Sequence, residues 1–161
     1  MNNPTTVERT SDLELVVTRT FNGPAHIVFE AWTRPELLQR WWAPKSFGIS
    51  FVSCEADVRT GGTYRFVFSH PAAEQPVAFF GRYIDVTPES RIVWTNEEGA
   101  DGPISTVTFE EKDGKTLLVL RELYPSKQAL DDAIASGSTG TSGAGEQFEL
   151  LDELLVTLAK P

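Results

Sequence analysis

Few side chains in this sequence have the type and spacing that acid–base, metal or nucleophilic chemistry needs. The two histidines, His26 and His70, stand on a predicted helix surface and at the edge of a predicted loop, and neither has a His or Cys at ligand spacing. A structural zinc site normally needs four such ligands. There is no GxSxG elbow and no GxGxxG after a strand. We therefore predict no catalytic residue, no metal site and no cofactor.

Charged residues on predicted strands are the remaining chemical candidates. Asp57 and Arg59 lie two apart on one predicted strand face. One interpretation is an exposed ladder of cross-strand ion pairs, each worth little. The other is an inward charge that orients a ligand carboxylate or phenol, which is costly unless it is paired. Glu55 and Glu122 are comparable candidates for an acid or base inside a cavity.

The amino-acid composition limits which classes of protein and which kinds of partner are compatible with this sequence. A net charge of -9 over 161 residues argues against nucleic acid and anionic membranes, which would repel the average surface. The single cysteine, Cys54, excludes an intrachain disulfide, fits a reducing cytoplasm, and is more often a small buried hydrophobe than a nucleophile. No apolar run approaches the roughly 20 residues of a membrane span, and the polar N-terminus does not resemble a signal peptide. We expect a cytoplasmic monomer or weak homodimer without membrane insertion.

The elements that position these residues follow from apolar periodicity. Residues 1–11 lack periodicity and are expected to be a flexible tail, followed by one domain over 12–161. Residues 13–21 alternate as a half-buried strand. In FNGPAHIVFEAWTRPELLQRWWAP, residues 21–44, Pro24 stands in the first turn of a helix, and Pro35 ends that helix and starts a second one.

Residues 48–124 change to a period of two, with turn signals that divide them into six strands. Asp113-Gly114 is the strongest hairpin signal. A two-residue turn there pairs Phe109 with Leu118, so that large apolar residues meet where a core should be. The six strands are therefore predicted to form an antiparallel meander.

Two helices are predicted after the strands. Ser126 is a plausible N-cap for a short helix with Leu130, Ala133 and Ile134 on one side. Residues 137–145, GSTGTSGAG, read as a flexible break, and an amphipathic helix over 146–160 supplies the only long apolar stripe that could cover the sheet. The predicted fold class is α+β, in the order β-α-α-β6-α. A curved antiparallel sheet wraps around the long C-terminal helix, two short helices close one end, and such an arrangement commonly leaves a cavity.

Several motifs occur in a familiar order along residues 13–158. The stretch over 21–44 has a Pro-initiated helix, Pro-Glu-Leu-Leu and a Trp pair. It is followed by Asp57-x-Arg59-x-Gly61-Gly62, Gly81-x-Tyr83, Val107-Thr108-Phe109 and Leu151-Asp152-Glu153-Leu154-Leu155. Together they resemble the START-like (SRPBCC, Bet v 1-like helix-grip) superfamily. The closest branch is the AHSA-type domain, homologous to the activator of the ninety-kilodalton heat-shock chaperone ATPase. Residues 137–145 depart from the pattern in length and Gly/Ser/Thr content, which leaves the start of the last helix open.

The resemblance implies a domain that binds small, largely apolar molecules, without implying one reaction. The leading hypothesis is a hydrophobic or aromatic ligand in an internal cavity, bound without chemical change. One alternative is a cyclase- or hydrolase-type enzyme in the same cavity. The other is a chaperone-associated stress-response module, which we rank last because the sequence reads as one domain.

Aromatic residues on one face of adjacent strands either fill a core or line a pocket, and both interpretations stay open. Trp32 is assigned to the core. Because the adjacent Trp41 and Trp42 cannot both face inward, Trp42 is placed at the cavity mouth or at an interface. The candidate cavity residues are Trp42, Tyr64, Phe66, Phe68, Tyr83, Trp94, Phe109, Leu118, Leu120, Phe148, Leu151 and Leu155.

Overall fold

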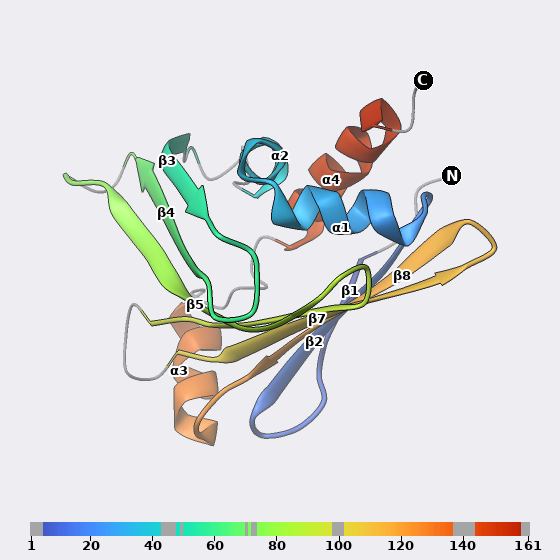
Figure 1. Cartoon of the computed structure of the whole chain (residues 1–161). Coiled ribbons are helices and arrows are strands. Elements are labelled where there is room, and N and C mark those ends of the chain that lie inside the picture. Colours follow the sequence, from blue (N-terminus) through green and yellow to red (C-terminus); the bar gives the residue numbers. More distant parts are fainter. Residues whose placement is uncertain are drawn as a thin grey trace.

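A computed structural model describes residues 5–42, 48, 50–69, 71, 74–97, 102–136 and 144–158 (Figure 1). Within these residues, no helix combines the length and apolar character that a membrane span needs. In chain order the elements are β1 (Thr6–Arg9), β2 (Glu14–Phe21), α1 (Ala25–Thr33), α2 (Pro35–Trp41), β3 (Ser50–Ala56), β4 (Thr63–Ser69), β5 (Val77–Thr87), β6 (Arg91–Thr95), β7 (Ile104–Lys112), β8 (Lys115–Leu123), α3 (Lys127–Ser136) and α4 (Ala144–Leu158).

The strands form one curved antiparallel sheet in the order β1-β2-β8-β7-β6-β5-β4-β3. The predicted meander is confirmed as β3 to β8, and β2 returns to pair with β8 along its whole length. Figure 1 shows α1, α2 and α4 together over the sheet, with α3 at its other end. The α+β helix-grip fold class is therefore confirmed.

The β7–β8 hairpin has the predicted register. Phe109 pairs with Leu118. Asp113 and Gly114 have φ angles of 55° and 77°, the left-handed conformations that a two-residue hairpin turn of this kind requires. Asp-Gly is one of the few dipeptides that adopts them at low cost, which is why the register could be predicted from sequence.

The expected flexible tail over residues 1–11 is wrong for Thr6–Arg9. These residues form β1, which pairs with β2 from Thr6 opposite Thr18 to Arg9 opposite Leu15. All four side chains are exposed. The segment therefore lacks the alternation of buried apolar and exposed polar residues that predicts a strand. Backbone hydrogen bonds to the edge of β2 hold it instead.

The two prolines of the first helical segment act as helix boundaries. Pro24 is the N-cap of α1, one residue before the predicted first turn, and Pro35 is the first residue of α2. Arg34 between the helices is extended, with φ −98° and ψ 119°, because the residue before a proline is forced out of the helical region. Helix α2 ends at Trp41, with Trp42 as its C-cap.

The C-terminal helices are confirmed with changes in detail. The Ser126 hydroxyl caps α3 and accepts from the Ala129 N–H at 3.0 Å. Leu130 is fully buried against Leu15 and Tyr124, and Ala133 packs against the same cluster, whereas Ile134, predicted on the same face, is 45% exposed. Helix α4 begins at Ala144, two residues before the predicted start, and residues 137–143 lie outside the described part.

The main core lies between the inner face of the sheet and the helices α1, α2 and α4. Phe148 of α4 is 1% exposed, and its ring centroid lies 5.6 Å from that of Phe21 on β2 and 6.4 Å from that of Trp32 on α1. Full burial of each large apolar side chain stabilises the fold by about 1.5–3 kcal/mol. The last helix is thus fixed to both sides of the core.

Candidate functional site

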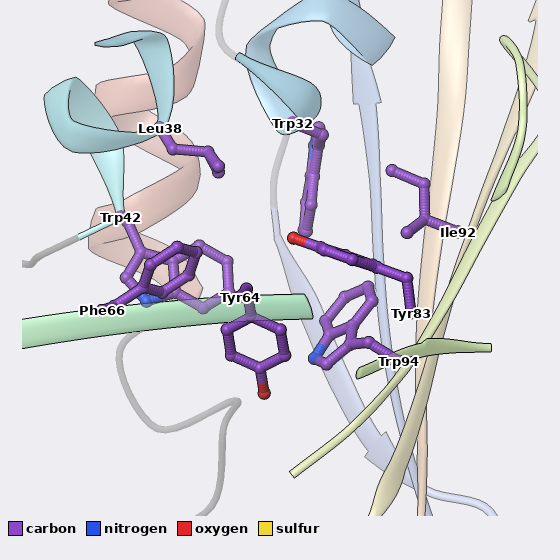
Figure 2. A pocket seen from close by; sticks show the side chains of 8 residues that line it. All are labelled: Trp32, Leu38, Trp42, Tyr64, Phe66, Tyr83, Ile92 and Trp94. Atoms are coloured by element: carbon purple, nitrogen blue, oxygen red, sulfur yellow. The ribbon is translucent and has the colours of Figure 1, made fainter. Parts of the chain in front are cut away.

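An apolar pocket lies between α1, α2 and strands β4, β5 and β6 (Figure 2). Helices contribute the side chains on one side of it and strands those on the other. Seven of its lining residues are 1–7% exposed, whereas Trp42 is only half-buried. The lining residues are Trp32, Leu38, Trp42, Tyr64, Phe66, Tyr83, Ile92 and Trp94.

The free space in this pocket is small, about 20 Å³. Such a volume holds about one water molecule. The rings occupy the remainder, since the centroid of Trp32 lies 5.9 Å from that of Trp94 and 6.0 Å from that of Trp42. The Trp42 centroid lies 5.4 Å from that of Phe66. A molecule larger than water can enter only if one of these side chains moves.

Strand pairing sets the far wall of the pocket. Tyr83 of β5 stands opposite Trp94 of β6, and the Tyr64 hydroxyl crosses from β4 to donate to the Thr95 carbonyl at 2.7 Å. The Thr95 carbonyl can lie this close to β5 because residue 81 is a glycine, since a Cβ on Gly81 would lie 2.2 Å from the same carbonyl oxygen. The three aromatic rings are therefore held by backbone contacts as well as by packing.

Helix α4 is connected to the pocket mouth through Trp42. The Gln147 side-chain N–H group donates to the Trp42 carbonyl, and Trp42 itself is the C-cap of α2. The adjacent Trp41 is 1% exposed and donates its indole N–H to the Ala31 carbonyl at 2.9 Å. Its ring centroid lies 4.7 Å from that of Trp32 and 5.4 Å from that of Trp42. The neighbouring tryptophans thus have different environments, one in the core and one at the pocket.

The structure brings together five of the twelve predicted cavity residues. Trp42, Tyr64, Phe66, Tyr83 and Trp94 line the pocket. The remaining predicted residues are buried in the main core beside it: Phe68, Phe109, Leu118, Leu120, Phe148, Leu151 and Leu155.

Sequence reasoning missed Trp32, Leu38 and Ile92 as pocket residues. Helical spacing places Trp32 and Leu38 on inward faces, and strand alternation places Ile92 two residues before Trp94 on the same face. These signals distinguish buried from exposed positions. They do not distinguish a packed position from one beside free space.

The charged candidates lie away from the pocket. Asp57 and Arg59 follow the end of β3 rather than lying on it, and their ion pair at 2.8 Å is exposed, in agreement with the surface interpretation. Glu55 is exposed, whereas Glu122 is 4% exposed and accepts from the Ser105 hydroxyl at 3.4 Å. His26 is exposed and His70 lies outside the described residues. The described part of the chain contains no group of three potential metal ligands.

A buried arginine was not predicted. Arg19 on β2 is 2% exposed, and its guanidinium bonds to Glu149 at 3.0 Å, to Asp152, and to the Thr5 hydroxyl at 2.9 Å. Arg19 lies two residues from both Val17 and Phe21, which face inward, so strand alternation indicates that Arg19 faces inward as well. Both acidic partners belong to α4, so the ion pairs join β2 to the last helix.

Cys54 is expected to be a poorly reactive thiol. Burial raises its pKa to about 11, with a further contribution from the Glu36 carboxylate, and its Sγ lies 3.7 Å from the Pro35 carbonyl. Because the thiolate is the nucleophile, alkylation by iodoacetamide at pH 8 should be roughly 100-fold slower than for a free thiol. Mass spectrometry of timed samples measures the rate, and unfolding in urea should restore it. A native rate equal to the unfolded rate would contradict this expectation.

Comparison with known proteins gives one family and a set of similar folds. The model of the family described as Activator of Hsp90 ATPase homolog 1-like protein matches residues 22–156. No protein of curated function matches the sequence.

Solved structures from several bacteria have a similar fold. A protein from Rhodobacter sphaeroides has a TM-score of 0.83 at 24% identity, covering 96% of this chain and 99% of that one. A protein from Mycobacterium smegmatis has a TM-score of 0.79 at 24% identity, with 96% and 99% covered. A protein from Chromobacterium violaceum has a TM-score of 0.70 at 26% identity, with 88% and 96% covered. These similarities agree with the observed topology.

Proposed function

We propose that this chain, which belongs to the Activator of Hsp90 ATPase homolog 1-like family, binds a small hydrophobic or aromatic molecule in the pocket between α1, α2 and β4–β6. The observation that carries the proposal is the lining itself, which consists of six aromatic rings and two aliphatic side chains. Ligand sites are mostly apolar, with a few polar groups that fix orientation. Tyrosine hydroxyls and indole N–H groups supply those polar groups in this pocket.

Ligand entry requires Trp42 to move. The other seven lining side chains are almost fully buried, and displacing any of them would disturb the core. Trp42 is half-buried at the end of α2, so its indole can swing toward solvent at lower cost. In this proposal the indole occupies the ligand's place in the free protein, and a ligand of suitable shape replaces it.

Binding without chemistry is favoured over catalysis by the composition of the wall. None of the eight lining residues carries a carboxylate or an imidazole, so they offer no conventional acid–base pair. Glu122 is buried, but it does not line the pocket among the described residues. As part of the same proposal we place the protein in the cytoplasm, on the basis of its single cysteine.

The proposal is tested by titrating the protein with a panel of lipids, flavonoids and polycyclic aromatics. The amide and indole NMR shifts are recorded at each step of the titration. We expect at least one compound to shift Trp42, Tyr83 and Trp94 while leaving α3, at the other end of the sheet, unchanged. Cys54 alkylation should also change, because its thiol contacts Pro35 at the start of α2. If no compound shifts the pocket signals, the proposal is wrong. Stoichiometric capture of a heat-shock chaperone would then favour the chaperone-associated alternative.

A further inference from the structure

We infer that the ligand carries an uncharged hydrogen-bond acceptor oxygen, such as a ketone, quinone or lactone carbonyl, on its apolar body. In this inference the Tyr83 hydroxyl and the Trp32 indole N–H are the groups that bind the oxygen. The inference rests on the proposed function and specifies the chemical class of the ligand.

The first observation is the indole of Trp32. The residue is 4% exposed and lines the pocket, and its Nε1 is buried without a hydrogen-bond acceptor in the described part of the chain. The neighbouring Trp41 shows that the fold can satisfy such a group, since its N–H donates to the Ala31 carbonyl at 2.9 Å. A buried donor without a partner is rare and calls for an explanation.

The second observation is the hydroxyl of Tyr83. The residue is 6% exposed, and Figure 2 shows the oxygen end of its side chain pointing toward the centre of the eight lining residues. The described residues give this hydroxyl no hydrogen-bond partner. Tyr64, on the adjacent strand and in the same pocket, instead donates its hydroxyl to the Thr95 carbonyl at 2.7 Å. The two tyrosines therefore differ in whether the protein itself uses their hydroxyl.

The chemistry of the two groups determines what they can bind. An indole N–H can only donate. Burial raises the pKa of Tyr83, with smaller contributions from Cys54 and Asp57, so the phenol remains protonated and can donate as well. A pure hydrocarbon would leave both donors without a partner, whereas an acceptor oxygen gives a partner to each donor that it reaches.

The ligand oxygen should be neutral. None of the eight lining residues carries a positive charge, and burial of an unpaired carboxylate in an apolar site is very costly. A carbonyl or ether oxygen accepts hydrogen bonds without that cost. Sites built to hydrogen-bond a ligand discriminate strongly against analogues that lack the bonding group.

A matched pair of compounds tests the inference. 1-Tetralone and tetralin share a bicyclic skeleton and differ by one carbonyl. We expect Tyr83→Phe to weaken tetralone binding about fivefold to tenfold, the effect of one neutral hydrogen bond, and to leave tetralin binding unchanged. Tyr64→Phe is the control, because its hydroxyl is already bonded to Thr95 and its loss should affect both compounds equally. Tetralone, but not tetralin, should also move the Trp32 indole N–H resonance downfield in the unmutated protein.

The outcomes separate this inference from the proposed function. The acceptor inference is wrong if three results occur together: both compounds bind, Tyr83→Phe weakens their binding equally, and the Trp32 indole resonance does not move downfield. In that case the proposed binding of apolar molecules still stands. If neither compound binds and the wider panel also fails, the proposed function falls and the inference falls with it. The Trp32 measurement uses the unmutated chain, so the test does not depend on the folding of a variant.

Discussion

The Asp152→Ala variant is expected to lose about 3 kcal/mol of unfolding free energy. Asp152 bonds to the guanidinium of Arg19, which is 2% exposed on the inner face of β2. The substitution leaves this charge buried with Glu149, whose side chain is 51% exposed, as its remaining carboxylate partner. A buried charge that loses its partner is among the most destabilising changes in a protein. Urea unfolding followed by tryptophan fluorescence measures the loss.

The same reasoning predicts a rescue. Burial raises the pKa of Asp152, the nearby Glu149 carboxylate adds to this rise, and Arg19 opposes it. Replacing buried ion pairs with apolar residues is often neutral or stabilising. Adding Arg19→Met to Asp152→Ala should therefore recover about 2 kcal/mol, because the variant no longer buries a charge.

Asp131→Ala is the matched control for this pair. Asp131 also lies on a helix and pairs with Arg9 and Lys127, both at 2.8 Å, but these side chains are 34–61% exposed. Exposed ion pairs contribute little, so the midpoint of unfolding should hardly change. The account of Arg19 would be wrong if Asp131→Ala and Asp152→Ala were equally mild, or if Arg19→Met made the Asp152→Ala variant less stable.

Local rules in the sequence were sufficient to predict strands β2 to β8 of the sheet. Asp113-Gly114 permits few backbone conformations, and that restriction fixed the pairing of β7 with β8. Strand alternation and two helix-breaking prolines fixed the remaining order. Thr6–Arg9 could not be found in this way, since β1 is exposed on every side chain and depends on the edge of β2, a tertiary feature.

The pocket could be predicted only in part, for a geometric reason. Alternation identifies inward positions such as Phe66, Trp94 and Phe109, yet it does not say which of them a helix covers. Helix α1 contacts both Phe109, whose centroid lies 5.7 Å from that of Phe29, and Trp94, whose centroid lies 5.9 Å from that of Trp32. Trp94 also lines the pocket, whereas Phe109 does not. That difference depends on the docking of α1 and α2 against the sheet. Arg19 was a different case. Strand alternation indicated that its side chain faces inward, but its acidic partners lie about 130 residues away in the chain and could not be identified from local patterns.

The adjacent tryptophans provide the second large effect, because replacing them should destabilise the protein to different extents. Trp41→Ala should cost about 3–5 kcal/mol, since it leaves a cavity in a closed core and removes the hydrogen bond to the Ala31 carbonyl. Trp42→Ala should cost roughly half as much, because its indole is only half-buried. Chemical unfolding of both variants, alongside the unmutated chain, gives the comparison.

Ligand binding should distinguish the two variants more sharply than stability does. In the proposed binding mode Trp42, which contacts Phe66 in the pocket, fills the space that a ligand would take, so the unmutated chain must displace the indole before it binds. Trp42→Ala removes that cost and leaves an apolar cavity, and cavities of about 150 Å³ in other proteins bind benzene. Added indole, at ten times its dissociation constant, should stabilise Trp42→Ala by about 1.4 kcal/mol. Trp41→Ala should gain less, because Trp41 does not line the pocket.

The affinity for a larger apolar ligand gives the final discrimination. If Trp42 occupies the site in the free protein, Trp42→Ala should tighten the binding of tetralin about tenfold, because the competent state is then populated without displacement. If Trp42 instead forms part of the wall that holds the ligand, the same substitution should weaken binding. Isothermal titration of tetralin into the two proteins separates these outcomes. Weaker binding would show that Trp42 is part of the wall that holds the ligand, and it would contradict the proposed displacement of Trp42.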